Sequence, residues 1–163
     1  MVQSIAAEVH SLAMAPATLQ VACFRVDGRD CAVDVLAIAE VLSPLPVTAL
    51  PGSPNFVEGL IELRGQFLPL IDLRKRFGAR DPLARSEGKY IVAPLGGIPV
   101  ALVVDEVTGV ERISAQAIQP APALEYGKSF VAGVIKWEQR ILMMLDITKL
   151  LNAQELAQLA AVA

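Results

Sequence analysis

The sequence holds few side chains of the types that carry out catalysis. Its one histidine, His10, lies near the N-terminus, away from the body of the chain, so Ser–His and Cys–His pairs are not expected there. Gly96 and Gly97 are not followed by the Lys-Ser/Thr that a phosphate-binding loop needs, and no glycine-rich dinucleotide fingerprint is present. The residue types therefore favour a protein that is not an enzyme and uses no cofactor and no metal.

Two pairs of residues could still do chemistry. Asp72 and Asp146 suggest a pair of acids, but each precedes a short helical pattern, so helix capping is the favoured interpretation. Cys23 and Cys31 flank a probable Gly turn and could face each other across a hairpin. In a chain expected to be cytoplasmic they are expected to stay reduced and to act as small apolar strand residues.

Basic residues gather in one segment, positions 64–89, which holds seven of the 14 lysines and arginines. Such a segment could bind nucleic acid, but among the charges from Arg74 to Lys89 only Phe77 supplies an aromatic ring, and the whole chain has a formal charge of −3. A solvated helix whose cations complement its C-terminus is favoured, with no nucleic-acid partner.

Arg64 is the most promising functional residue of that segment. Together with Gly65 it forms the expected tip of a hairpin between two apolar strands, next to a proline-rich loop and to Phe67. An arginine beside exposed apolar residues is typical of an interaction hot spot.

An internal repeat is the strongest structural signal. Residues 56–77, FVEGLIELRGQFLPLIDLRKRF, align without a gap with residues 130–151, FVAGVIKWEQRILMMLDITKLL, and seven of the 22 pairs are identical. The offset matches Arg64 with Glu138, so the fold itself does not require a positive charge at this tip. The upstream segments correspond more loosely, which predicts two similar halves.

The strands of each half are short. Alternating and apolar runs predict strands at 19–26, 31–35, 38–42, 56–63, 66–71, 90–95, 98–104, 130–137 and 140–145. Short helices are expected at 73–77, at 114–118 and after Asp146. Asn152 and Glu155 match a capping box that begins a C-terminal helix.

The expected fold is all-β with short helices: two five-stranded barrels that share an apolar seam, because closure removes sheet edges and barrels this small are marginal alone. We expect a flexible tail at 1–18, a body at 19–151 divided into halves at 19–88 and 89–151, and a helix at 152–163. The shared seam accounts for a hydrophobic content of 54%. Prolines and glycines interrupt the apolar runs, so no membrane insertion is expected.

Several motifs together resemble the CheW-like domain family of chemotaxis coupling proteins. They are GLIELRG at 59–65, FLPLIDLR at 67–74, the strand at 100–110 and IQPAP at 118–122, and the resemblance covers about residues 19–159. Glu62 stands where the family commonly has Asn. The resemblance implies two SH3-like barrels and a non-catalytic adaptor. Its expected partners are the tips of methyl-accepting chemoreceptors and the regulatory domain of the histidine kinase CheA.

The resemblance also implies where the partners bind. The receptor's helical tip is expected in a groove between the barrels, at Ile38, Glu40, Gly59, Arg64 and Val110, and the kinase at the barrel ends. Each of these positions also has a plain structural explanation: core for Ile38 and Val110, a backbone requirement for Gly59, and a solvated charge for Glu40 and for Arg64. A functional role is most strongly favoured for Arg64. A small-molecule-binding double barrel is the alternative function.

Overall fold

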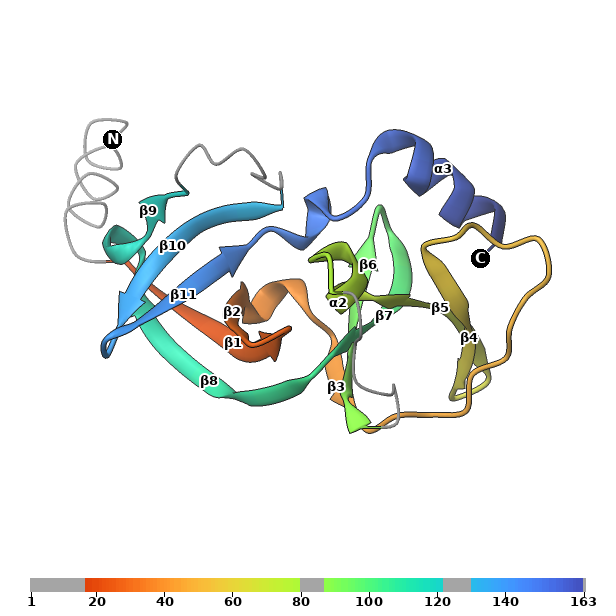
Figure 1. Ribbon diagram of the computed structural model, residues 1–163, viewed down its shortest axis with the longest axis horizontal. Coiled ribbons are helices and arrows are strands. Elements are labelled where there is room, and N and C mark those ends of the chain that lie inside the picture. Colours follow the sequence, from red (N-terminus) through yellow and green to blue (C-terminus); the bar gives the residue numbers. More distant parts are fainter. Residues whose placement is uncertain (1–16, 80–86, 122–129, 163) are drawn as a thin grey trace, which may run out of the picture.

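The strands and helices of the computed structural model occupy the segments for which the sequence has apolar or alternating patterns (Figure 1). The structure describes residues 17–79, 87–121 and 130–162. The strands are β1 (Thr18–Val26), β2 (Arg29–Asp34), β3 (Glu40–Leu42), β4 (Val57–Leu63), β5 (Gln66–Asp72), β6 (Lys89–Leu95), β7 (Ile98–Val104), β8 (Glu106–Ser114), β9 (Gln119–Pro120), β10 (Val131–Trp137) and β11 (Arg140–Leu145). The helices are η1 (Val35–Ala37), α2 (Leu73–Arg76), η3 (Ala115–Ala117), η4 (Ile147–Lys149) and α3 (Ala153–Val162).

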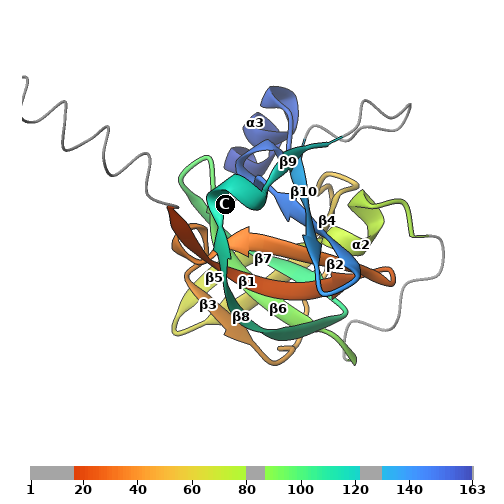
Figure 2. The ribbon, with the colours of Figure 1, turned by 90° about the vertical axis from the view of Figure 1, so that its left-hand side faces the viewer.

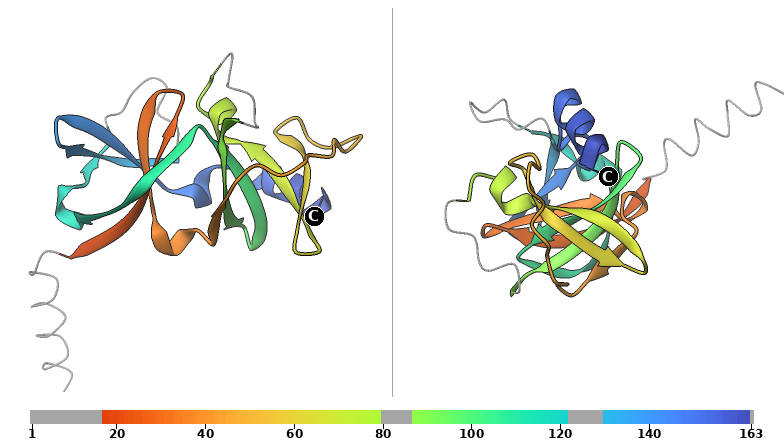
Figure 3. Two further views of the ribbon diagram at one scale, coloured as in Figure 1. Left: turned by 90° about the horizontal axis from the view of Figure 1, so that it is seen from below. Right: turned by 90° about the vertical axis from the view of Figure 1, so that its right-hand side faces the viewer.

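The strands form two sheets, which lie side by side along the long axis of the molecule (Figure 1). Barrel A has the strand order β8-β1-β2-β11-β10-β9, and barrel B has the order β3-β6-β7-β5-β4. Figure 2 shows barrel A from its end, and the right panel of Figure 3 shows barrel B from the opposite end. The expected fold of two small barrels is confirmed. The two-residue β9 is the sixth strand of barrel A, and Thr48 forms a single bridge to Leu60 in the equivalent place of barrel B.

The expected boundary between residues 88 and 89 does not separate the two barrels. Hairpin β1–β2 comes from the first half of the chain but pairs with β11, and hairpin β6–β7 comes from the second half but pairs with β5. Both of these contacts are parallel, whereas the other strand pairs are antiparallel. The two repeats thus exchange their first hairpins, so each barrel needs both halves of the sequence.

The turns and caps follow local sequence rules. Asp27 and Gly28 have φ values of 51° and 75°, which match the twist of a two-residue hairpin as the Asp-Gly pair predicts. The Asp72 carboxylate accepts from the Arg74 backbone N–H at 3.0 Å and begins α2, while Gly78, at φ 88°, ends it.

The capping box is also confirmed. The Asn152 and Glu155 side chains each accept from the other residue's backbone N–H, at 2.8 and 3.0 Å. Helix α3 therefore starts where the sequence predicts, and its Leu159 is fully buried.

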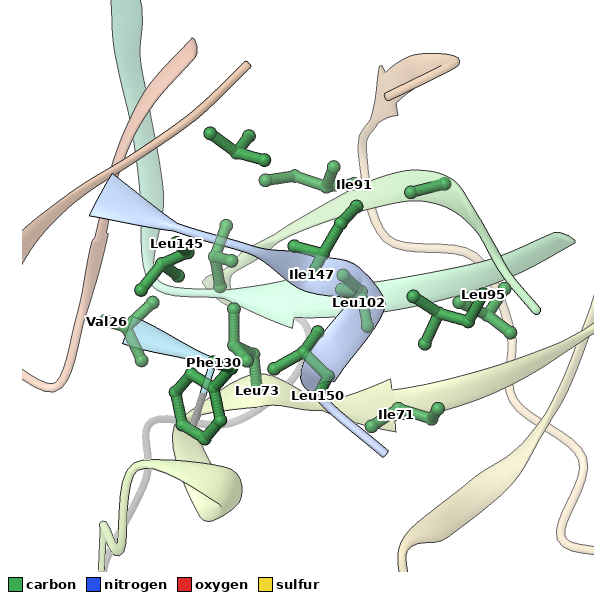
Figure 4. Close-up of a cluster of buried hydrophobic side chains, with 14 of the residues drawn as sticks. Val26, Ile71, Leu73, Ile91, Leu95, Leu102, Phe130, Leu145, Ile147 and Leu150 are labelled. Carbon is green, nitrogen blue, oxygen red and sulfur yellow. The ribbon is translucent and has the colours of Figure 1, made fainter. Parts of the chain in front are cut away.

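An apolar seam joins the barrels and forms the largest buried cluster (Figure 4). Adjacent residues of one strand point alternately into a barrel and into the seam: Val21 and Cys23 belong to the core of barrel A, and Ala22 and Phe24 to the seam. The seam includes Val26, Ile71, Leu73, Ile91, Leu95, Leu102, Phe130, Leu145, Ile147 and Leu150 (Figure 4). Several strands are therefore buried on both faces, which explains the high hydrophobic content.

A buried ionic cluster crosses between the barrels beside the seam. Arg74, only 1% exposed, donates to both carboxylate oxygens of Asp72 at 2.9 Å and to Asp105 at 3.3 Å. Asp105 also accepts from the backbone N–H of Asp27, in the β1–β2 turn, at 2.6 Å. Burial alone would lower the pKa of Arg74, but its hydrogen bonds and the charges of both aspartates outweigh burial and raise it. The cluster thus ties α2 of barrel B to a turn of barrel A.

The expected strand at 100–110 is in fact parts of two strands, β7 and β8, which are separated at Asp105, and β8 runs further than expected. Its sequence, EVTGVERIS, is mostly exposed and carries charges and a glycine, so it lacks the apolar alternation of the other strands. It pairs with β1 over its length and carries the chain from barrel B to barrel A (Figure 3). The expected tail lies outside the described residues up to position 16, and β1 already begins at Thr18.

Candidate functional site

Arg64 lies at the tip of hairpin β4–β5, as expected from the sequence. Arg64 and Gly65 have φ values of 50° and 81°, the two positive values of a tight hairpin turn. The turn lifts the Arg64 side chain off the barrel, and 70% of it is exposed.

Two hydrogen bonds join Arg64 to Glu40, the first residue of β3. The Arg64 Nη1 and Nη2 atoms donate to Glu40 Oε1 and Oε2 at 2.6 and 2.7 Å, a bidentate pair of a planar guanidinium with a carboxylate. The hydrogen bonds from Arg64 lower the pKa of the Glu40 carboxyl, so the pair is charged at neutral pH. Arg64 and Glu40, which are 24 positions apart in the sequence, are thereby held together on the surface of barrel B.

A cavity of about 510 Å³ adjoins this pair. Pro46 of the proline-rich loop, Leu60 and Phe67 give it apolar walls, and Glu62 and Arg64 give it charged ones. Phe67 is 67% exposed, so a large ring stands at the edge of the cavity. The expected grouping of Arg64, the proline-rich loop and Phe67 is confirmed.

Gly59 is buried beneath this surface, and its role in the fold is clear. A Cβ at this position would lie 2.5 Å from the backbone oxygen of Thr48, whose N–H and C=O both pair with Leu60. In the repeat, a Cβ at Gly133 would lie 2.6 Å from the backbone oxygen of Gln119. Glycine is thus required at both positions, because in each barrel a short edge segment lies directly against the strand that carries the glycine, β4 or β10.

Ile38 and Val110 differ from each other in exposure. Ile38 is half-buried and packs against the seam, whereas Val110, on β8 of barrel A, is 59% exposed. Of the five residues expected at the receptor site, the structure joins Arg64 and Glu40 directly and places the other three separately.

Sequence reasoning missed two exposed apolar side chains next to Ile38. Leu36 in η1 is 90% exposed, and Val41 in β3 is 41% exposed. The apolar run at 35–42 gave no sign of which residues would face outward. Ile141, also exposed, could have been found from the repeat, because it is the equivalent of Phe67.

The described basic residues of segment 64–89 are mostly neutralised by partners within the fold. Besides the pairs of Arg64 and Arg74, Lys75 contacts Glu58 at 2.5 Å and Arg76 contacts Glu155 at 2.7 Å. The expectation of a solvated helix is wrong for Arg74, which is buried. With their charges taken up in this way, these residues do not form the free basic surface that nucleic-acid binding requires.

The cysteines are free and buried. Cys23 points into barrel A and Cys31 into the seam, so they do not face each other. Burial raises the pKa of both thiols, that of Cys31 to about 12, which keeps the Cys31 thiol protonated. Within residues 17–79, 87–121 and 130–162, no cluster of three or more metal-ligating side chains occurs, and no helix is long and apolar enough to cross a membrane.

Comparison with known proteins places these features in one family. The family model of the CheW-like domain matches residues 20–155. The chain is 32% identical to the chemotaxis protein CheW of Klebsiella aerogenes over 136 residues, which cover 82% of each protein. It is also 32% identical to the chemotaxis protein CheW of Thermotoga maritima over 145 residues, 88% of this chain and 95% of that one.

A solved structure agrees with the sequence matches. The scaffolding protein TtCheW of Thermoanaerobacter tengcongensis superposes with a TM-score of 0.75 at 28% sequence identity, covering 82% of this chain and 92% of that one. The double barrel, its exchanged hairpins and the Leu-Arg-Gly tip thus lie in a chain that belongs to the CheW-like domain family, a family of chemotaxis scaffolding proteins.

Proposed function

We propose that this protein is a non-catalytic adaptor that couples the tips of methyl-accepting chemoreceptors to the histidine kinase CheA. The observation that carries the proposal is the bidentate Arg64–Glu40 pair, which stands exposed among apolar side chains. Membership of a family of chemotaxis scaffolding proteins supports the same role. The adaptor would act in the cytoplasm, at receptor arrays on the membrane.

The receptor side of the proposal rests on what the pair offers to a helical tip. Glu40 aligns the guanidinium of Arg64, so less side-chain freedom is lost when a partner binds. Phe67, 67% exposed at the edge of the cavity that Arg64 lines, supplies an apolar contact beside the charged pair. Gly59 lies buried in the same hairpin, and the receptor-binding roles of Ile38 and Val110 are part of the proposal.

The kinase side of the proposal rests on the two barrel ends. Hairpin β4–β5 presents Phe67 at one end of the molecule, and hairpin β10–β11 presents Ile141 at the other (Figure 1). Both side chains are 67% exposed. Two apolar contact points at opposite ends suit a protein that joins two barrel-shaped partners into an extended array.

Co-sedimentation with receptor-containing vesicles tests the receptor contact. The wild-type protein is expected to sediment with the vesicles, and Arg64→Ala is expected to remain in the supernatant at the same concentration. Glu138→Ala, which changes the equivalent tip of the other barrel, is the control and should sediment like the wild type. If all three proteins behave alike, Arg64 does not contact the receptor.

A further inference from the structure

A second cavity, of about 580 Å³, shares no lining residue with the one beside Arg64. It opens between α2, η4 and the start of α3, where the barrels meet. Its lining residues are Lys75, Arg76, Phe130, Thr148, Lys149, Leu150, Leu151, Asn152 and Glu155. Its volume lies within the range of about 300–1,000 Å³ that is typical of small-molecule sites.

The internal repeat brings two equivalent lysines to this cavity. Lys75 and Lys149 each follow a capping aspartate by three residues, and they are one of the seven identical pairs of the repeat. Lys75 belongs to α2, which follows β5 of barrel B in the chain. Lys149 belongs to η4, which follows β11 of barrel A. Both line the wall of this one cavity.

The charges of the cavity do not cancel. Arg76 is fully engaged, since it donates to both oxygens of Glu155 and to the backbone oxygen of Leu150 at 2.7 to 2.9 Å. Lys75 contacts Glu58. Lys149 is exposed, and within the described part of the chain it makes no ion pair. Lys75 and Arg76 are paired with the carboxylates of Glu58 and Glu155, so one positive charge, that of exposed Lys149, is left to attract an anion.

The rest of the cavity lining offers apolar surface and hydrogen-bond donors, which suit a ligand larger than a single inorganic ion. Phe130, Leu150 and Leu151 belong to the apolar seam and form a buried floor. The hydroxyl of Thr148 already donates to Asp146. Asn152 accepts through its side-chain oxygen from Glu155, which leaves its amide N–H groups as donors toward a ligand.

We propose that this cavity binds a small organic anion, with its carboxylate or phosphate held by Lys149 and its apolar body lying on Phe130. The combination of a cationic rim and an apolar floor provides both parts of this recognition. The cavity shares no lining residue with the one beside Arg64, so a ligand here would not compete directly for that surface.

Titration of the full-length protein with 2-naphthoate, followed by two-dimensional NMR, tests this proposal. We expect saturable shifts of the backbone amides of Thr148, Lys149 and Leu151. Lys149→Glu is expected to weaken binding by about tenfold or more, because it replaces a charge-assisted contact by repulsion. Lys136→Glu, a matched charge reversal on exposed β10 outside the cavity, should bind like the wild type.

The same titration can overturn the proposal. Absence of saturable shifts at residues 148–152 would exclude the site for this class of ligand. Equal weakening by Lys149→Glu and Lys136→Glu would show a general charge effect, and binding of neutral 2-methylnaphthalene as tightly as 2-naphthoate would show an apolar pocket without anion recognition. The NMR spectrum of each free variant reports whether it is folded.

Discussion

Hairpins β4–β5 and β10–β11 have the same place in their barrels but differ at their tips. Both have a glycine under a short edge segment, an exposed apolar residue and a two-residue turn with positive φ. The first tip has Arg64, bound to Glu40, and the second has Glu138 in the same position. The shared features are therefore requirements of the barrel, and the differences mark what one hairpin does that the other does not.

The residues that follow the two hairpins show the same contrast. Asp72 and Asp146 both cap a short helix, each accepting a backbone N–H at 3.0 Å. Two residues later Arg74 is buried between two aspartates, whereas its equivalent, Thr148, bonds its own capping aspartate at the surface. Arg74 of the first repeat thus takes part in an ionic link between the barrels, which its equivalent Thr148 does not.

The largest effect is expected from breaking that link. Arg74→Met leaves Asp72 buried without its counter-charge, which should lower the free energy of unfolding by about 3–5 kcal/mol. Thr148→Val, at the equivalent position, should cost about 1 kcal/mol or less. Urea unfolding measures both values, and equal losses would contradict the difference between the repeats.

Both edge glycines should be sensitive to an added side chain, and Gly59 somewhat more so, because it also has a φ of 155°. Gly59→Ala and Gly133→Ala each place a Cβ about 2.5 Å from a backbone oxygen, so each should destabilise the protein by about 1–3 kcal/mol. Thermal unfolding of both variants tests this. A large loss at one glycine and none at the other would show that the edge segments are not equivalent.

Arg64 should affect binding without affecting folding. Arg64→Ala is expected to weaken receptor binding about tenfold, as the loss of a charge-assisted contact does, and to leave the circular dichroism spectrum and the thermal midpoint unchanged. Glu138→Ala should change neither property. Loss of structure in Arg64→Ala would instead make the Arg64–Glu40 pair part of the fold.

The smallest effect concerns the turns. Glu138 and Gln139 have φ values of 48° and 76°, where the first hairpin has glycine in the second place. Gln139→Gly should therefore stabilise the protein by about 1 kcal/mol, and Gly65→Gln should destabilise it by a similar amount. Chemical denaturation of both variants measures the two changes, and a destabilising Gln139→Gly would show that Gln139 makes a compensating contact.

Local patterns predicted most of the elements but not their partners. Asp27-Gly28, the capping aspartates and the Asn152–Glu155 box correctly predicted where strands and helices begin and end, because these signals act over a few residues. The exchange of hairpins depends on contacts between distant segments, such as Ile71 opposite Leu102, and apolar residues alone do not specify which strand they pair with.

The candidate site was predicted only in part, because local patterns identify single residues but not the contacts between distant segments. The hairpin tip and its proline-rich neighbour identified Arg64, but its bond to Glu40 joins two separate segments and appears only in the structure. Exposure of Leu36 and Val41 depends on how η1 and β3 turn between the barrels, which no local pattern reveals. The expected receptor-binding roles of all five residues, Ile38, Glu40, Gly59, Arg64 and Val110, remain predictions.

The most direct measurement of the central claim is the phosphorylation rate of the cognate kinase CheA on vesicles that carry the cognate receptor. Adding the wild-type protein or Glu138→Ala is expected to change that rate in a receptor-dependent way, and Arg64→Ala is expected to need about tenfold more protein for the same change. If the wild-type protein leaves the rate of the receptor–kinase mixture unaltered at every concentration, the protein does not couple receptor to kinase.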